Sequence, residues 1–199
     1  MCTIYYQGIQ SEVAKMTKKW KIWVSISLIL GILLTCLIIQ QVIRLQSRPV
    51  VYTEPQAYSI VFPGNWKIDG GGQKSGYEIL SIYSYDYQKV TNPGGGFGRG
   101  QIKIAVSIVD KEAKTLTRIV NEKFTGTEKS FKKEFLNIDG HKAIRISGIF
   151  DAGDAFSPMI ETFIDYSENE YAWLVGYHSG DRKSAATIMK VEESFKVLK

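Results

Sequence analysis

Residues 129–178 read KSFKKEFLNIDGHKAIRISGIFDAGDAFSPMIETFIDYSENEYAWLVGYH, and this stretch decides the fold. It contains runs rich in β-branched and aromatic residues, which are favoured in strands. The runs cover Lys129–Asn137, Lys142–Phe150, Met159–Tyr166 and Tyr171–His178. Short, turn-like segments join them, namely Asp139-Gly140, DAGD at 151–154 and SENE at 167–170. Because strands joined by short turns pair with their neighbours, the stretch predicts an antiparallel meander.

The segments on either side of the meander add strands and two helices. Strand candidates precede it at Tyr58–Phe62, Trp66–Ile68, Tyr77–Tyr85 and Ile102–Val109. Apolar residues at helical spacing predict a helix over 115–124 with Thr115 as N-cap, and a closing helix over about 182–195 with Asp181 as N-cap. Strands and helices do not alternate along the chain. The predicted fold class is therefore α+β, an antiparallel sheet covered by helices.

A long apolar segment lies near the N-terminus. Residues 22–39 carry no formal charge. At about 1.5 Å per residue, a helix of this length covers about 27 Å, close to the thickness of a bilayer's hydrocarbon core. We predict a transmembrane helix over residues 20–43. The alternatives are a buried core helix, a cleaved signal peptide and a lipoprotein anchor at Cys36, although Thr35 and the apolar residues after Cys36 do not fit a lipobox.

The formal charge is concentrated beside this segment. The whole chain carries +5, and residues 50–199 contain nineteen basic and nineteen acidic side chains, so the excess lies in residues 1–49. The body therefore has no basic surface that would indicate nucleic-acid binding. Four lysines precede the apolar segment and two arginines follow it, which predicts a cytoplasmic N-terminus and an extracytoplasmic body.

These features divide the chain into four segments. We expect a cytoplasmic segment at 1–19, the transmembrane helix at 20–43, a linker at 44–57 and an extracytoplasmic domain at 58–199. Both cysteines lie before residue 37, so the body has no disulfide. Translation from Met16 would place an ordinary basic segment directly before the helix, and we expect mass spectrometry of the native N-terminus to decide between Met1 and Met16.

Three stretches of the body resemble the PsbP-like family. They are YSIVFPGNWK at 58–67, similar to the family's opening strand, GHKAIRISG at 140–148, similar to a central strand, and IMKVEESFK at 188–196, similar to the closing helix. The resemblance covers roughly residues 55–199. It implies an α/β/α sandwich that acts as a binding or assembly module without enzymatic chemistry, and it supplies no catalytic residues. The photosynthetic members are extrinsic proteins, so the transmembrane segment departs from that pattern.

Few residues of the body suggest chemistry. His178, Ser179 and Asp181 lie between a predicted strand and a predicted helix, where they form a candidate hydrolase site or, more simply, a helix cap. Asp151 and Asp154 are weak candidates for a metal site because they offer two carboxylates to a hard cation.

Tyrosines are unusually dense in one predicted strand. Tyr77, Tyr83, Tyr85 and Tyr87 have odd numbers, so a strand would place them on one face. That face is either packed under a helix or exposed as a binding surface, to which His178 and Asp181 would contribute.

Together these features predict a single-pass membrane protein with an extracytoplasmic, non-enzymatic binding or assembly module. We expect it to contact the lipid bilayer and a protein partner, and to need no cofactor and no nucleic acid. The alternative is an envelope hydrolase or a metal-binding sensor domain that uses the region of His178 and Asp181.

Overall fold

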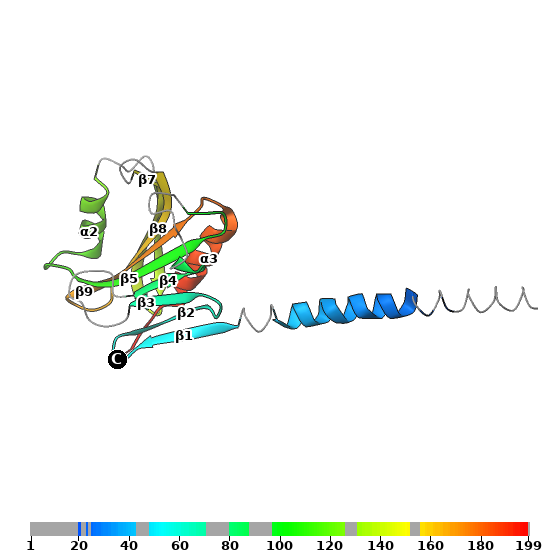
Figure 1. The fold of residues 1–199 in the computed structure, drawn as a ribbon. Helices are drawn as coiled ribbons and strands as arrows, with labels where there is room; N and C mark the ends of the chain where they lie inside the picture. Colours follow the sequence, from blue (N-terminus) through cyan, green and yellow to red (C-terminus); the bar gives the residue numbers. More distant parts are fainter. Residues whose placement is uncertain are drawn as a thin grey trace, which may run out of the picture. The chain divides into compact units, whose positions relative to one another are not determined.

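The computed structural model describes residues 20, 23, 25–42, 48–70, 80–87, 97–125, 131–151 and 156–198, with the backbone alone for 150–151 and 156–158. The chain divides into two compact units, residues 1–48 and 49–199, which are described separately (Figure 1).

The first unit contains the apolar helix. Residues Ser25–Val42 form eighteen helical residues with a mean hydropathy of 2.1, and none of this window is buried. The helix is long and apolar enough to cross a membrane. The sequence alternative of a buried core helix would have placed its apolar side chains inside the protein.

The described residues of the second unit form two antiparallel sheets and two helices. The strands of the larger sheet are ordered β3-β4-β5-β9-β8-β7-β6 and those of the smaller one β1-β2-β10. The strands are β1 (Pro49–Glu54), β2 (Tyr58–Pro63), β3 (Lys67–Gly70), β4 (Leu80–Tyr83), β5 (Ile102–Asp110), β6 (Phe131–Ile138), β7 (His141–Asp151), β8 (Phe156–Ile164), β9 (Glu170–His178) and β10 (Lys196–Val197), and the helices are α2 (Leu116–Lys123) and α3 (Arg182–Glu193). The predicted α+β class, the meander and both helices are confirmed.

The two helices cover opposite faces of the larger sheet. Successive residues of a strand point to opposite faces, and the neighbours Phe163 and Ile164 of β8 belong to two separate apolar clusters. Phe163 packs with α2, whereas Ile164 packs with α3 and β2. The body is therefore a three-layer arrangement in which α2 covers one face, and α3 with the small sheet covers the other.

Strand β1 differs from the sequence prediction. Residues 49–54 of the predicted linker pair along their whole length with β2. The sequence of β1 shows no alternation of apolar and polar residues, because the strand has no buried face. Its first three residues are exposed, and only Tyr52 and Glu54 are partly buried. Tyr52 packs beside Tyr58, with 6.3 Å between ring centroids. Main-chain pairing and this aromatic contact thus define a strand that carries little hydrophobic pattern.

Candidate functional site

The predicted tyrosine surface forms in part. Tyr83 is the last residue of β4, and Tyr85 and Tyr87 lie beyond it, so the expectation of one continuous strand is wrong. The chain leaves the strand at Ser84, whose hydroxyl accepts a bond from the amide of Ile102. The rings nevertheless gather, with centroids 5.7 Å apart for Tyr83 and Tyr85 and 4.4 Å apart for Tyr83 and Tyr87.

This tyrosine cluster is half-buried. It extends to Phe97 and Tyr177, and Lys103 Nζ lies 5.7 Å and 5.8 Å from the ring centroids of Tyr83 and Tyr177. Tyr77 lies outside the described residues. The cluster is thus neither core nor a freely exposed binding surface.

His178, Ser179 and Asp181 form a turn and a helix cap. The Gly180 amide donates to His178 Nδ1 at 3.0 Å, so the ring is neutral with its proton on Nε2, and burial lowers the pKa of His178. Ser179 Oγ donates to Asp181 at 2.9 Å and not to the histidine. The hydroxyl-to-imidazole contact that nucleophilic catalysis needs is therefore not made.

Asp181 is the N-cap of α3, as predicted. Its carboxylate accepts the Ser184 amide at 2.9 Å. Hydrogen bonds from Ser184, and then from Ser179, hold the pKa of Asp181 well below its usual range. The carboxylate thus stays ionised as a cap.

The candidate metal ligands Asp151 and Asp154 stay a prediction from the sequence. Asp154 and the side chain of Asp151 lie outside the described residues. Among the residues that are described, no group of three or more His, Cys, Asp or Glu side chains is placed to hold a metal ion.

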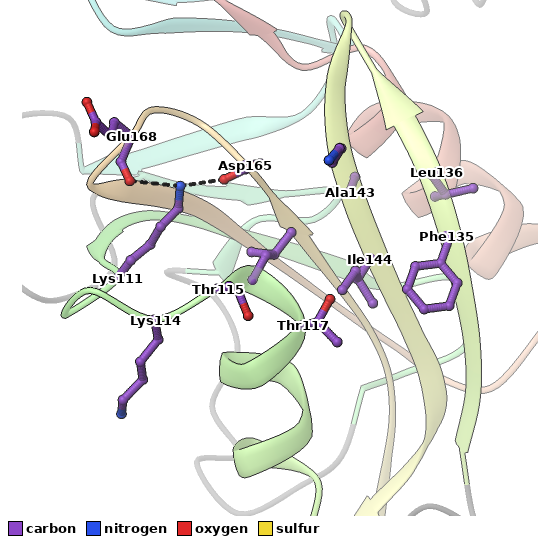
Figure 2. Close-up of a pocket in the computed structure, with 12 residues that line it drawn as sticks. Lys111, Lys114, Thr115, Thr117, Phe135, Leu136, Ala143, Ile144, Asp165 and Glu168 are labelled. Atoms are coloured by element: carbon purple, nitrogen blue, oxygen red, sulfur yellow. Dashed lines mark hydrogen bonds and ion pairs between the residues drawn. The ribbon is translucent and has the colours of Figure 1, made fainter.

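Another hollow on the body lies between α2 and the strands β6 and β7. We call it the α2 groove, and its volume is about 570 Å³. Figure 2 shows Thr115 and Thr117, at the start of α2, on one side and Phe135, Leu136, Ala143 and Ile144 of the two strands on the other. Thr115 is also the N-cap of α2, because its Oγ1 accepts the Arg118 amide at 3.3 Å.

Lys111 closes one end of the α2 groove. Its side chain is buried, and its ammonium donates to the carbonyls of Ser167 and Glu168 and pairs with Asp165 (Figure 2). A second hollow of about 660 Å³ lies beyond it, beside His141. The charge of Lys111 is therefore compensated, and this residue positions the loop that follows β8.

The other side of the α2 groove is the free edge of the larger sheet. Phe135 of β6 is 71% exposed, which is unusual for an aromatic residue in a strand. Lys133 lies on the same face of β6 as Phe135. Lys142 of β7 lies on this face too, opposite Asn137 in the register. Lys133 bonds to the neutral Asn121 side chain, and Lys142 has no ionic partner among the described residues. This edge thus combines an exposed ring with two uncompensated positive charges.

A buried cluster fixes α2 above the sheet. Glu161 of β8 is 2% exposed and accepts Trp173 Nε1 at 2.7 Å and pairs with Lys123 Nζ at 3.0 Å. The same ammonium lies 3.5 Å from the centroid of the Trp173 ring. This cation-π contact and ion pair tie the last residue of α2 to the sheet, so the α2 groove has a fixed wall.

The sequence reasoning gave none of the groove residues a role in a site. One signal was present, since consecutive Lys132 and Lys133 inside a strand candidate are typical of an edge strand. The exposure of Phe135 had no signal, because the same spacing suits a buried face.

Comparison with known proteins shows which known fold the body resembles. No protein-family model and no curated protein matches this chain. Among solved structures, the chain is similar to cyanobacterial PsbP (CyanoP) from Synechocystis sp. PCC 6803, with 14% identity and a TM-score of 0.51 over 76% of this chain and 93% of that one. It is also similar to LpqN, involved in cell envelope biogenesis of Mycobacterium tuberculosis, with 14% identity and a TM-score of 0.44 over 76% and 90% of the two chains. The body has a PsbP-like fold.

Proposed function

We propose that this protein is a single-pass membrane protein whose PsbP-like body is a non-enzymatic binding or assembly module on the extracytoplasmic side. The observation that carries the proposal is the apolar helix Ser25–Val42, of which no residue is buried and which is followed within a few residues by a body with its own core. Exposed apolar area of this size is stable in lipid and unfavourable in water.

The α2 groove supports the binding role. The candidate catalytic residues His178 and Asp181 are engaged in a turn and a cap, whereas the groove is open and has a fixed wall. The body has no net charge, so its partner is expected to be a protein rather than a nucleic acid.

Reporter fusions in a bacterial host test the membrane arrangement. Alkaline phosphatase fused after residue 199 is expected to be active, because the enzyme folds only outside the cytoplasm, and the same enzyme fused before residue 1 is expected to be inactive. An inactive C-terminal fusion, or release of the full chain from membranes by alkaline carbonate, would overturn the arrangement.

Photocrosslinking tests the binding role. A photoreactive amino acid in place of Thr117, in the α2 groove, is expected to form a discrete adduct in native membranes. The matched control replaces Ala186, an exposed residue of α3 on the opposite face of the sheet. Equal labelling from both positions would contradict a specific role for the groove.

A further inference from the structure

The free edge of β6 presents main-chain groups as well as side chains. In the described part of the sheet, β6 pairs only with β7, over eight consecutive residue pairs from Phe131 to Ile138 without a bulge. The edge is therefore regular enough to accept another strand. Its second half, from Phe135 to Ile138, contains no charged side chain that would discourage pairing.

The turn that joins β6 to β7 determines which residues point outward. Asp139 and Gly140 have φ values of 52° and 84°, a two-residue hairpin loop in which the flanking residues Ile138 and His141 exchange main-chain hydrogen bonds. Alternate residues of an antiparallel strand bond to opposite sides. The main-chain groups of Ile138 and Leu136 therefore point to β7, and those of Asn137, Phe135 and Lys133 point away from it.

The pairing of β7 with β8 leads to the same assignment. The Asp165 amide donates to the Lys142 carbonyl at 2.8 Å, so Lys142 bonds toward β8. Its neighbours His141 and Ala143 then bond toward β6, where their partners are Ile138 and Leu136. Phe135 and Asn137 thus offer N–H and C=O groups that no described residue uses.

The side chains around this open ladder define the chemistry of a partner strand. On the face that carries the α2 groove, Phe135 is flanked by Lys133, with 5.5 Å between Lys133 Nζ and the ring centroid, and by Asn137 with Lys142 beside it. The acidic residue of this strand, Glu134, lies on the other face, where Lys132 Nζ pairs with it at 2.7 Å. The open face is therefore positively charged around one exposed ring.

We propose that the β6 edge binds an extended acidic segment of a partner protein by antiparallel strand addition. An apolar residue of that segment packs against Phe135 at the α2 groove, and acidic residues two positions before and after it face Lys133 and Lys142. The inference rests on the proposed binding role and names the chemistry of the partner.

A second copy of this chain fits the edge less well. Self-pairing centred on Lys133 or on Glu134 places like charges opposite each other, which is unfavourable. Self-pairing centred on Phe135 places Lys133 beside Asn137 of the other copy and supplies no carboxylate for Lys142. Charge complementarity thus favours an acidic segment.

The test uses the full chain in phospholipid nanodiscs and a fluorescein-labelled peptide, Thr-Glu-Thr-Val-Thr-Glu-Thr. Saturable fluorescence anisotropy is expected for this peptide, and none for the version with lysines in place of glutamates. Lys133→Glu is expected to weaken binding about fivefold or more, because it replaces an attraction with a repulsion. Lys132→Glu, at the neighbouring exposed position on the other face, is the matched control and is expected to change binding less than about twofold. Equal effects of the two variants would overturn the proposal.

Two N-methylated peptides test main-chain pairing directly. Methylation of the valine and both glutamates removes the N–H groups that face β6 in antiparallel addition and is expected to abolish binding. Methylation of the two central threonines affects only the outer side and is expected to preserve it. Equal loss from both peptides, or light scattering that shows a dimer broken by Lys133→Glu, would overturn strand addition by a partner. If the peptide does not bind while Thr117 still crosslinks selectively, the edge proposal is wrong and the binding module stands. An inactive C-terminal reporter would instead remove the membrane arrangement alone.

Discussion

A glutamate side chain is buried on each face of the larger sheet, and the surroundings of the two glutamates differ. Below α3, Glu192 is fully buried and pairs with Arg145, which is 3% exposed, through a 3.4 Å contact from Arg145 Nε. Below α2, Glu161 is paired with Lys123, which reaches it from the solvent side. The α3 face is therefore a sealed interior, whereas the α2 face is a clamped helix beside an open groove. The α3 face therefore stabilises the body, whereas the α2 face can bind a partner with little effect on stability.

The largest effect is expected from breaking the ion pair on the sealed face. At pH 9, where Glu192 is ionised, Arg145→Met leaves this carboxylate buried without its cation and is expected to destabilise the body by about 3 to 5 kcal/mol in urea unfolding. The double variant Arg145→Met with Glu192→Leu is expected to recover most of the loss, because no buried charge is left. An unchanged free energy of unfolding for Arg145→Met would show that the α3 face is not sealed.

The pH dependence of stability is expected to come from the same carboxyl. Burial, only partly opposed by Arg145, raises the pKa of Glu192 to about 8. The folded state then binds this proton more tightly than the unfolded state. The stabilisation that comes from binding this proton is fully present below about pH 4.5 and is lost as pH rises toward 8. The free energy of unfolding falls over this range by at most about 1.4 kcal/mol per pH unit.

Glu192→Gln isolates this slope. The free energy of unfolding of the wild type minus that of the variant is expected to decrease as pH rises from 4.5 to 8 and to level off above that, because the neutral glutamine does not titrate. The opposite contribution of buried His178, whose pKa is lowered, is common to both proteins and cancels. A constant difference across this range would contradict a protonated Glu192.

Substitutions that add volume are expected to change stability differently on the two faces of the sheet. A Cβ on Gly176 of β9 would lie 2.2 Å from Cγ2 of Ile188 on α3, so Gly176→Ala is expected to cost about 1 to 3 kcal/mol. Thr117→Leu adds more volume on the open face and is expected to change stability by less than about 0.5 kcal/mol. Thermal unfolding of both variants checks the contrast, and similar melting temperatures would remove it.

The clamp of α2 should have a smaller and more local effect. Lys123→Met removes the cation from the Trp173 ring and from Glu161, and is expected to cost about 1 to 2 kcal/mol and to change Trp173 fluorescence. The exposed Lys132→Met, on the other face of the sheet, is the matched control. Unchanged hydrogen exchange in α2 of the Lys123 variant would show that the clamp does not hold the helix.

The smallest effect is expected at the rim of the open groove. Phe135 is 71% exposed, so Phe135→Ser is expected to change the free energy of unfolding by less than about 0.5 kcal/mol while weakening peptide binding. A large loss of stability would show that this ring packs as core, and the contrast between the faces would fail.

The order and type of elements could be read from the chain because their signals are local. Asp139-Gly140 predicted the hairpin, and both residues adopt the positive φ that such a turn needs. Thr115 and Asp181 predicted the helix starts, and both side chains accept the expected amides. The tyrosines show the limit of local reasoning: alternation predicted one strand face, but β4 ends at Tyr83, and ring contacts beyond the strand assemble the cluster.

By itself, the sequence determined the apolar helix, the neutral body and the strands and helices, since hydropathy, charge and turn chemistry act between residues close in the chain. Only the tertiary structure decided that β6 is an edge, that Phe135 stays exposed and that Lys133 and Lys142 flank it. These features depend on strand order and register, which are set by packing between segments far apart in sequence. The groove could not be recognised before the sheet was assembled.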